Sequence, residues 1–288
     1  MKQQAVIGVS LGGRTLLVGR VKDGVLEQSV TRKINNRESE GNIIKEVVNA
    51  IKEVMDDSVV GMGFGAPSLV DVEKGIVYNV QKIKSWKQVH IKDILEDTFG
   101  IPVYVNNDAN CFAIGELYFG QAKEVENLIG LILGAGVGAG IVFKKHLFSG
   151  TNCGAGEYGN IPYRDHDIEY YLSDNYFDLK YGLSFDLLLE RAKRADKIAL
   201  AIFEQYGFDL GNAIKIIMYS VDPEMIIIGG PISAAFSFFE KAMWQKVNNF
   251  LYKHSLEKLK IQATKQENIA VLGAAALYFD ANNHVLSK

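Results

Sequence analysis

Residues 128–143, LIGLILGAGVGAGIVF, and residues 6–21, VIGVSLGGRTLLVGRV, share the pattern that decides the fold. In each stretch an apolar strand runs into a glycine turn, Gly134 to Gly138 or Gly12 to Arg14, and a second apolar strand follows. Backbone N–H groups exposed in such turns form concavities that bind anions. The repeat therefore predicts duplicated domains, each opening with a β-hairpin, whose turns can hold a polyphosphate from both sides of a cleft.

Strands and helices alternate along the rest of the chain. Apolar residues at helical spacing predict helices over residues 43–55, 91–99, 110–118, 185–207, 210–221, 236–252 and 270–279, with strands at 103–105 and 225–228. This alternation is typical of the α/β class. No linker composition marks a boundary. We expect a first domain of residues 1–118 completed by a closing helix, 270–288, and a second domain of residues 119–269.

Composition excludes several classes of protein. The 288 residues include 31 Lys and Arg and 34 Asp and Glu, so positive charge is not in excess. This balance argues against a nucleic-acid-binding protein, because binding phosphates needs clustered positive charge. Two cysteines, Cys111 and Cys153, are too few for a disulfide framework and fit a reducing compartment. The longest uncharged stretch, 128–143, is shorter than the roughly 20 apolar residues that span a bilayer. We expect a cytoplasmic protein with no nucleic-acid or membrane partner.

One carboxylate stands at the end of a predicted strand. Val103–Val105 runs into Asn106-Asn107-Asp108-Ala109-Asn110, and the carboxyl end of a strand is a usual position for chemistry in an open α/β sheet. Taken alone, an Asn-Asp pair is more often a turn or a helix cap. The pair has more weight here because three glycine clusters, Gly134–Gly140, Gly154–Gly159 and Gly229-Gly230, follow it in order.

This ordered set resembles the ROK family of sugar kinases, sugar-responsive repressors and related open reading frames, from about Ala5 to Leu277. The resemblance implies the actin-like, hexokinase-like (ribonuclease H-like) fold: two α/β domains around a central cleft, with the last helix returning to the first domain. It also implies phosphorylation of a hexose or N-acetylhexosamine with ATP and Mg²⁺. A homodimer is the expected assembly, because family members are commonly dimers.

The same resemblance implies roles for individual residues. Asp108 is expected to act as the general base that accepts the proton of the sugar hydroxyl. The sugar-binding residues implied are Gly65, Pro67, Asn79, Asn107, Asp108, Glu157, Asn160 and Glu169. The nucleotide-binding residues implied are Ser10, Gly12, Gly13, Arg14, Gly134, Ala135, Gly136, Gly138, Gly229 and Gly230.

The glycine loops depart from the family pattern at three positions. Ser10 replaces the first-loop Asp that helps to place Mg²⁺ in the family, and Arg14 replaces a Thr. Arg14 either binds phosphate through its guanidinium or is an ordinary surface arginine, and the sequence leaves both open. Ala135 replaces the Thr of the second loop and removes a hydroxyl that binds phosphate.

The zinc motif of the family is missing as a set. The family's Glu-x-Gly-His becomes Glu157-Tyr158-Gly159-Asn160, and no cysteine lies between Asn160 and Glu169. A tetrahedral zinc site needs about four nitrogen or sulfur ligands, so we predict no zinc. The hypothesis is that Tyr170, Tyr171, Tyr176 and Phe177 replace the metal by packing.

Two functions are compatible with this pattern. The first is an ATP-dependent sugar kinase of glucokinase or N-acetylhexosamine kinase type. The alternative is a sugar-binding or sensing protein with weak or no turnover, which the changes at Ser10, Arg14, Ala135 and Asn160 favour. A DNA-binding repressor and an actin-like ATPase with another acceptor are less favoured. The aromatic residues Phe236, Phe238, Phe239 and Trp244 serve either a dimer interface or, more often for such a pattern, the core.

Overall fold

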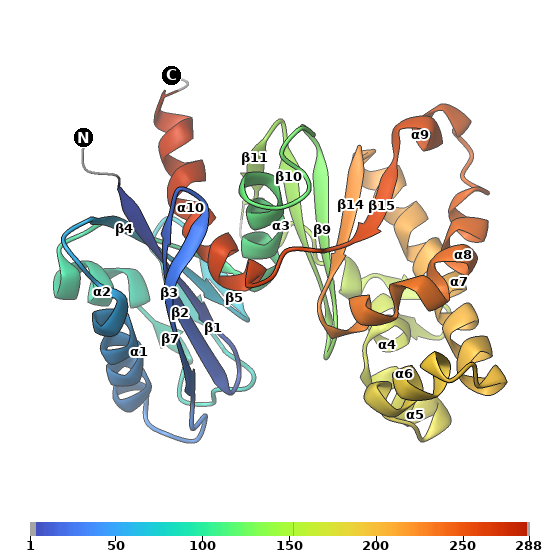
Figure 1. Cartoon of the computed structure of the whole chain (residues 1–288), viewed down its shortest axis with the longest axis horizontal. Coiled ribbons are helices and arrows are strands. Elements are labelled where there is room, and N and C mark those ends of the chain that lie inside the picture. Colours follow the sequence, from blue (N-terminus) through green and yellow to red (C-terminus); the bar gives the residue numbers. More distant parts are fainter. Residues whose placement is uncertain (1–3, 152, 287–288) are drawn as a thin grey trace. The chain divides into compact units, whose positions relative to one another are not determined.

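The computed structural model describes residues 4–151 and 153–286 (Figure 1). The α-helices are α1 (Glu40–Val54), α2 (Ile91–Phe99), α3 (Asp108–Tyr118), α4 (Ile168–Leu172), α5 (Asn175–Tyr181), α6 (Phe185–Lys193), α7 (Lys197–Val221), α8 (Phe236–Val247), α9 (Lys253–Lys258) and α10 (Ile269–Leu286). Short 3₁₀ helices cover Tyr158–Asn160 and Pro231–Ala235. No helix within the described residues is long and apolar enough to cross a membrane.

The strands form two larger and two smaller sheets. The first larger sheet holds β1 (Ala5–Leu11), β2 (Thr15–Lys22), β3 (Val25–Lys33), β4 (Val59–Ala66) and β8 (Val103–Asn107). The second holds β9 (Leu128–Leu133), β10 (Val137–Phe143), β11 (His146–Phe148), β14 (Met225–Gly229) and β15 (Lys260–Ala263). A three-stranded sheet contains β5 (Leu69–Asp71), β6 (Ile76–Tyr78) and β7 (Gln88–Val89), and β12 (Pro162–Tyr163) pairs with β13 (His166–Asp167).

The two larger sheets have the same strand order. The first runs β3-β2-β1-β4-β8 and the second runs β11-β10-β9-β14-β15, so each places its third, second, first, fourth and fifth strands in that sequence. In the first sheet β1 pairs antiparallel with β2 and parallel with β4, and in the second β14 pairs parallel with β9 and β15. The predicted duplication of a unit that opens with a hairpin is confirmed.

The last helix packs on the first sheet through glycine. At Gly8 in β1 and Gly63 in β4, an added Cβ would overlap the backbone carbonyl oxygens of Val271 and Ala274 in α10. These two positions therefore let the α10 backbone approach the sheet more closely than any side chain would allow. The expectation that the closing helix returns to the first domain is confirmed, and α10 contacts β1, β4 and α3 (Figure 1).

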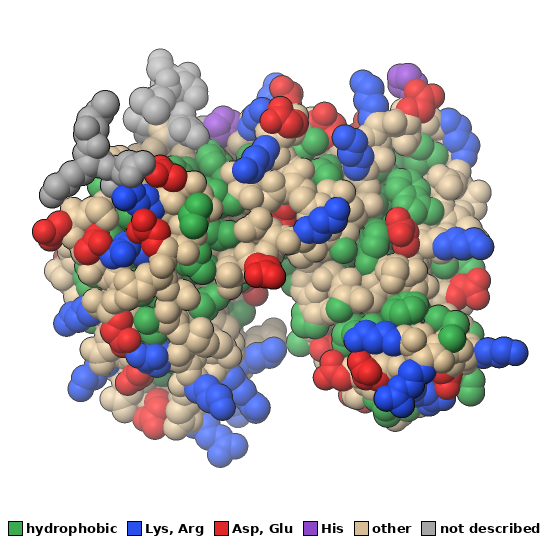
Figure 2. Space-filling model, viewed as in Figure 1, with side chains coloured by type: hydrophobic (Ala, Val, Ile, Leu, Met, Phe, Trp, Pro, Cys, Tyr) green, Lys and Arg blue, Asp and Glu red, His purple; other side chains and the backbone are tan. Residues whose placement is uncertain are grey.

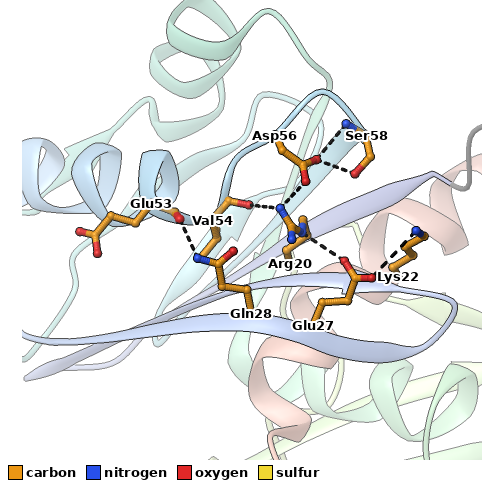
Figure 3. A network of polar contacts seen from close by, with 8 residues as sticks. All are labelled: Arg20, Lys22, Glu27, Gln28, Glu53, Val54, Asp56 and Ser58. Atoms are coloured by element: carbon orange, nitrogen blue, oxygen red, sulfur yellow. Dashed lines mark hydrogen bonds and ion pairs between the residues drawn. The ribbon is translucent and has the colours of Figure 1, made fainter.

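An ion-pair network holds the β2–β3 hairpin to the end of α1 (Figure 3). The Arg20 guanidinium in β2 pairs with Glu27 in β3 at 3.2 Å and with Asp56, which follows α1. It also donates to the carbonyl of Val54 at 3.4 Å. Hydrogen bonds from Ser58 to the Asp56 carboxylate are the main cause that lowers the pKa of Asp56. The network lies on the surface and stabilises the join between these elements modestly.

Two compact units make up the chain. Within the described residues, the first unit comprises residues up to Glu124, residues Gly140–Ala155 and residues from Lys265 onward. The second comprises Val125–Ala139 and Gly156–Thr264. The units differ from the expected domains at three places. Residues 119–124, 140–155 and 265–269, which were expected in the second domain, group with the first unit.

Two of the predicted helices end at other residues. The break expected near residues 208–209 lies instead at Arg194-Ala195-Asp196, so that α7 continues unbroken through Asp209. Ala195 adopts a left-handed conformation with φ +58°, and the Asp196 side chain accepts hydrogen bonds from the N–H groups of Ile198 and Ala199. The helix expected over 236–252 ends at Val247, before Asn248 and Asn249, because asparagine is a weak helix former.

Candidate active site

Asp108 lies at the carboxyl edge of the first sheet. It is the exposed first residue of α3 and directly follows β8. The parallel register pairs Ser10 of β1 with Gly65 of β4, and Gly65 with Asn106 of β8. The ends of these three strands therefore lie side by side, which brings the first glycine loop, the Gly65 turn and Asp108 to one edge.

A buried asparagine network holds the turn that carries Asp108. The Asn107 side chain caps α3 by accepting a hydrogen bond from the Asn110 N–H at 2.7 Å. The Asn106 Oδ1 accepts from the Asn107 N–H at 2.9 Å and from the Asn110 Nδ2 at 2.8 Å. The cap interpretation thus holds for Asn107, while Asp108 remains exposed one residue later. The predicted sugar contact of Asn107 stays a prediction.

Residues distant in sequence complete this network. The Asn106 Nδ2 lies 3.3 Å from the Ser149 Oγ, and the Cys153 Sγ lies 3.5 Å from the Asn106 Oδ1. Burial raises the pKa of the Cys111 thiol, and the charge of Asp108 raises it further. The predicted site residues did not include Asn106, Asn110 or Ser149. The asparagine-rich run 106–110 was the available signal for the first two, and nothing in the local sequence marks Ser149.

The remaining predicted sugar residues of the first unit follow β4 and β6. Gly65 is buried, with the Cys111 Sγ occupying the space where its Cβ would project. Pro67 is half-buried in the turn before β5. Asn79 is exposed, has φ +48°, and donates its N–H to the Lys87 carbonyl at 2.9 Å. Its left-handed backbone turns the chain sharply after β6.

The first glycine loop closes the β1–β2 hairpin. The Gly12 N–H donates to the Thr15 carbonyl at 2.7 Å, and the Arg14 carbonyl accepts from the Ile34 N–H at 2.9 Å. The Arg14 side chain is exposed. Its carbonyl is thus held by Ile34, while its exposed side chain is accessible to an anion.

The second glycine loop is supported by Glu169. The Glu169 Oε2 accepts a hydrogen bond from the Val137 N–H at 2.9 Å, and an added Cβ at Gly136 would lie 2.8 Å from this oxygen. The Gly134 carbonyl accepts from the Asp174 N–H at 2.7 Å. Glu169, which the resemblance places on the sugar, therefore has one oxygen engaged in holding the loop predicted for the nucleotide.

The glycine pair after β14 adjoins this loop. Gly229 ends β14 beside Ile132 of β9, and Gly230 has φ +81°. Only glycine adopts that conformation readily, and a Cβ there would strike the Leu133 carbonyl. Pro231, the next residue, packs on Gly134. The second unit therefore gathers Gly134, Ala135, Gly136, Gly229 and Gly230, and the half-buried Gly138 follows within β10.

Asn160 positions Glu157. Both residues are exposed at the ends of a single 3₁₀ turn, and the Asn160 Nδ2 donates to the Glu157 Oε2 at 2.9 Å. Gly159 between them is buried. The residue that stands in place of the family histidine thus orients one of the predicted sugar-binding carboxylates.

A buried aspartate and packed rings hold the segment that lacks the zinc motif. The Asp209 side chain in α7 is 0% exposed and pairs with Arg164 at 2.7 Å. It also accepts hydrogen bonds from the Tyr163 hydroxyl at 2.9 Å and from Gln205 at 3.0 Å. Tyr171, Tyr176 and Phe177 are buried, and His166 stacks on Tyr170 at 3.8 Å between ring centroids. Residues 4–151 and 153–286 contain no group of three or more His, Cys, Asp or Glu side chains placed to hold a metal.

The predicted residues fall into two sets. The first unit brings together Ser10, Gly12, Gly13, Arg14, Gly65, Pro67, Asn79, Asn107 and Asp108, of which Ser10, Gly65 and Asn107 lie at ends of neighbouring strands. The second unit contains Gly134, Ala135, Gly136, Gly138, Glu157, Asn160, Glu169, Gly229 and Gly230. Of the four aromatic residues considered for an interface, Phe239 lies in the core and Phe238 stacks on Phe203.

Curated relatives of this chain include two sugar kinases. It is 27% identical over 310 residues to the glucokinase of Thermotoga maritima, covering 96% of this chain and 98% of the relative. It is also 27% identical over 310 residues to the N-acetyl-D-glucosamine kinase of Mannheimia succiniciproducens, covering 94% and 98%.

Solved structures with the same fold include a regulator and a kinase. A ROK family transcriptional regulator, a homologue of the E. coli MLC protein, matches with a TM-score of 0.87 and 21% identity over 99% of this chain and 80% of that one. A glucokinase from Streptomyces griseus, crystallised with glucose and AMPPNP, matches with a TM-score of 0.79 and 23% identity over 95% and 98%. The profile of the ROK family matches residues 6–281, and the chain therefore belongs to the ROK family.

Proposed function

We propose that this protein is an ATP-dependent sugar kinase with Asp108 as its general base. The observation that carries the proposal is the exposed Asp108 carboxylate at the carboxyl edge of the first sheet, on a turn held by buried asparagines. Kinship with a glucokinase and an N-acetyl-D-glucosamine kinase supports a hexose or N-acetylhexosamine as acceptor.

In the proposed reaction Asp108 orients the acceptor hydroxyl toward the γ-phosphoryl group. A carboxylate is a weak base, so in the proposed step the proton moves to Asp108 late, as the new oxygen–phosphorus bond forms. The asparagine network keeps the Asp108 backbone in one position, which lowers the entropic cost of aligning the two reactants. Positioning is the main contribution expected of the protein in phosphoryl transfer.

Sugar recognition is assigned to carboxylate and amide groups. Glu157, oriented by Asn160, supplies acceptors for sugar hydroxyls, and the Oε1 of Glu169 supplies another. Charged acceptors bind hydroxyls more strongly than neutral ones do. Asn79 and the Gly65–Pro67 turn line the acceptor side in the first unit.

The donor's phosphates are assigned to the glycine loops. The backbone N–H groups of Ala135 and Gly136 and the Arg14 guanidinium supply positive charge toward them. Mg²⁺ usually takes one or two protein carboxylates together with substrate phosphates and waters. Ser10 offers a hydroxyl where the family pattern has a carboxylate, so this set fits a Mg²⁺ carried mainly by the phosphates. When bound, the ion would neutralise charge on the transferring group.

The test is a mass-spectrometric screen of the purified protein with ATP, Mg²⁺ and a panel of hexoses and N-acetylhexosamines. Asp108→Asn keeps the shape of the side chain and removes the base. We expect a phosphosugar from the parent protein, a turnover roughly 10²- to 10⁴-fold lower in the variant, and similar sugar affinity in both.

Two outcomes would contradict parts of this proposal. Full turnover by Asp108→Asn would show that another group is the base. Sugar binding in calorimetry with no phosphosugar from any acceptor would instead favour the sensing protein, which Ser10, Arg14 and Ala135 already suggest through the lost carboxylate and hydroxyl.

A further inference from the structure

A cationic pocket lies at the end of α3 opposite to Asp108. It has a volume of about 430 Å³, and all its lining residues belong to the first unit: Leu117, Tyr118, Lys123, Lys144, Lys145 and His146. Asp108 begins α3 and Tyr118 ends it, so the pocket is about 15 Å from the carboxylate along the helix. Sites for small molecules commonly measure roughly 300 to 1,000 Å³. The pocket therefore has room for a hexose-sized ligand and is separate from the proposed reaction.

Cations dominate the lining of this pocket. Lys123, Lys144 and Lys145 are exposed, His146 is half-buried, and the six lining residues include no carboxylate. Lys123 and Lys145 form no ion pair with an acidic side chain among the residues that the structure describes. Figure 2 shows Lys and Arg side chains beside a histidine near the upper edge of the view, over the turn between β10 and β11 in Figure 1. Like charges around one space create a positive potential that attracts anions.

The turn that carries two of the lysines has an unfavourable sequence for its conformation. Phe143 pairs with His146 across β10 and β11, so Lys144 and Lys145 form a two-residue turn. Their φ angles are +50° and +65°, in the left-handed region that residues other than glycine, asparagine and aspartate rarely adopt. Turns of this kind favour Asn-Gly or Asp-Gly. The backbone conformation therefore gives no reason for a lysine pair at this position.

The duplication provides an internal comparison for this turn. The corresponding turn of the first sheet, between β2 and β3, joins Lys22 to Val25 and consists of Asp23 and Gly24. Their φ angles are +50° and +76°, so both turns place two residues in the left-handed region. The first sheet uses a favoured pair there, whereas the second sheet replaces it by two cations. Residues held in rarely populated conformations are concentrated at binding and active sites, so the lysine pair points to a ligand.

Buried carboxylates hold the other elements around the pocket. Asp280 of α10 lies 3.4 Å from the Nδ1 of His146. Glu116 of α3 accepts a hydrogen bond from the Gln121 N–H at 3.0 Å and so shapes the turn that leads to Lys123. Neither carboxylate lines the pocket, and both are buried. The pocket is thus formed by elements that are fixed to the body of the first unit, and α3 contacts β11 (Figure 1).

We propose that this pocket binds a phosphate monoester of about the size of a hexose phosphate, outside the catalytic site. Such a group carries a charge of about −2 at neutral pH and has three acceptor oxygens, which lysine ammonium groups bind as point charges. Leu117 and Tyr118 offer an apolar surface to the carbon skeleton of the ester. Two sources share this chemistry: the sugar phosphate that the proposed reaction makes and other phosphorylated metabolites. The inference rests on the proposed function only for the first source.

The test separates a role in binding from a role in the fold. The test variant is Lys144→Asn/Lys145→Gly, which removes both charges and installs a sequence that suits the observed turn. The matched control is Lys45→Gln/Lys52→Gln, which removes two exposed charges from α1 in the same unit. Calorimetry at low salt and without ATP would titrate each protein with glucose 6-phosphate, N-acetylglucosamine 6-phosphate, glycerol 3-phosphate, inorganic phosphate and glucose. Turnover does not contribute under these conditions.

We expect the two hexose phosphates to bind the parent and the control alike, and the turn variant at least about tenfold more weakly. Thermal unfolding should show that the turn variant is at least as stable as the parent, because its turn has a favoured sequence. Lys123→Gln, on the α3 side of the pocket, should weaken the same binding step. Equal binding of glycerol 3-phosphate would identify phosphorylated metabolites in general as the ligands, and its weaker binding would identify the sugar phosphates.

Four results would overturn the inference. They are no binding of any phosphate ester by the folded parent, equal affinities of the turn variant and the parent, an equal loss of affinity in the control, and binding of inorganic phosphate or glucose as tight as that of the hexose phosphates. A protein that fails these tests yet makes a phosphosugar would leave the kinase proposal intact. Binding through these lysines without a phosphosugar from any acceptor would refute the kinase and leave the pocket assignment intact.

Discussion

Asn106 is the residue on which the geometry around Asp108 depends. Its amide is buried and joins the Asn107 N–H, the Asn110 side chain and Ser149. A buried amide with these partners keeps one rotamer, and its loss leaves buried donors without acceptors. The residue touches no reacting atom in the proposed mechanism. It is a positioning residue whose effect reaches the chemistry through the backbone of Asp108.

Asn106→Ala should lower kcat about tenfold or more with little change in the KM for sugar, because the catalytic carboxylate loses its alignment. Asn106→Asp keeps the acceptor oxygen and should recover part of the loss. Asn42→Ala, which removes an exposed amide of α1, is the control. Steady-state kinetics measure both constants. Unchanged kcat in a destabilised Asn106→Ala protein would show that the network serves stability alone.

The segment from Pro162 to Leu172 is held to α7 by an ion pair and by packed rings. Arg164 pairs with Asp209 of α7 and also lies over the Tyr163 and Tyr171 rings, at 5.1 and 5.4 Å from their centroids. The hairpin of β12 and β13 and the start of α4 are thereby held to α7. Glu169, which supports the second glycine loop, lies on this segment. That aromatic packing takes the place of the metal stays a hypothesis.

Asp209→Asn should reduce the free energy of unfolding by about 2 kcal/mol. This is less than the roughly 3–5 kcal/mol of a fully buried pair, because Arg164 is 44% exposed. The sugar KM should rise as Glu169 loses its support. Urea unfolding and kinetics measure the two effects. Glu190→Gln, which breaks an exposed pair with Lys193, is the control and should change neither quantity. Equal stability of Asp209→Asn and the parent would contradict the anchoring role.

At the scale of the whole molecule, α10 joins the end of the chain to its beginning. It packs on β1 and β4 through Gly8 and Gly63, and Gly273 within it meets the Cys111 carbonyl of α3. The helix thus contacts the sheet whose edge carries Asp108 and the helix that Asp108 begins. Shifting α10 would therefore move Asp108 as well as lower the stability of the first unit.

Gly63→Ala should lower the free energy of unfolding by about 1–3 kcal/mol, because its methyl group has no space beside the Ala274 carbonyl. Gly41→Ala is the matched control. No atom lies within 4 Å of a Cβ at Gly41 in α1, so this change should be neutral or stabilising by up to about 1 kcal/mol. Thermal and urea unfolding of both variants test the contrast. Loss of stability in both would indicate a general cost of replacing glycine.

The spacing of apolar residues predicted helices and strands well where the buried side chains recur at the period of the element. The hairpins at residues 6–21 and 128–143, the strand before Asp108 and the closing helix were all predicted from apolar spacing and glycine positions. The break between α6 and α7 was misplaced because Asp209 looks like a helix end when its partner is unknown. Buried beside Arg164, an aspartate is compatible with the middle of a helix.

By itself the sequence determined the α/β class, the duplicated hairpin units, the position of Asp108 after a strand, and membership of the ROK family. Those features depend on residues close together in the chain, whose spacing sets backbone conformation and burial. Only the tertiary structure decided that Lys123 lies with Lys144 and Lys145, that Asp209 holds Arg164, and that Cys153 adjoins Asn106. Such pairs are distant in sequence, and their contact is decided by the packing of whole elements, which no local spacing encodes.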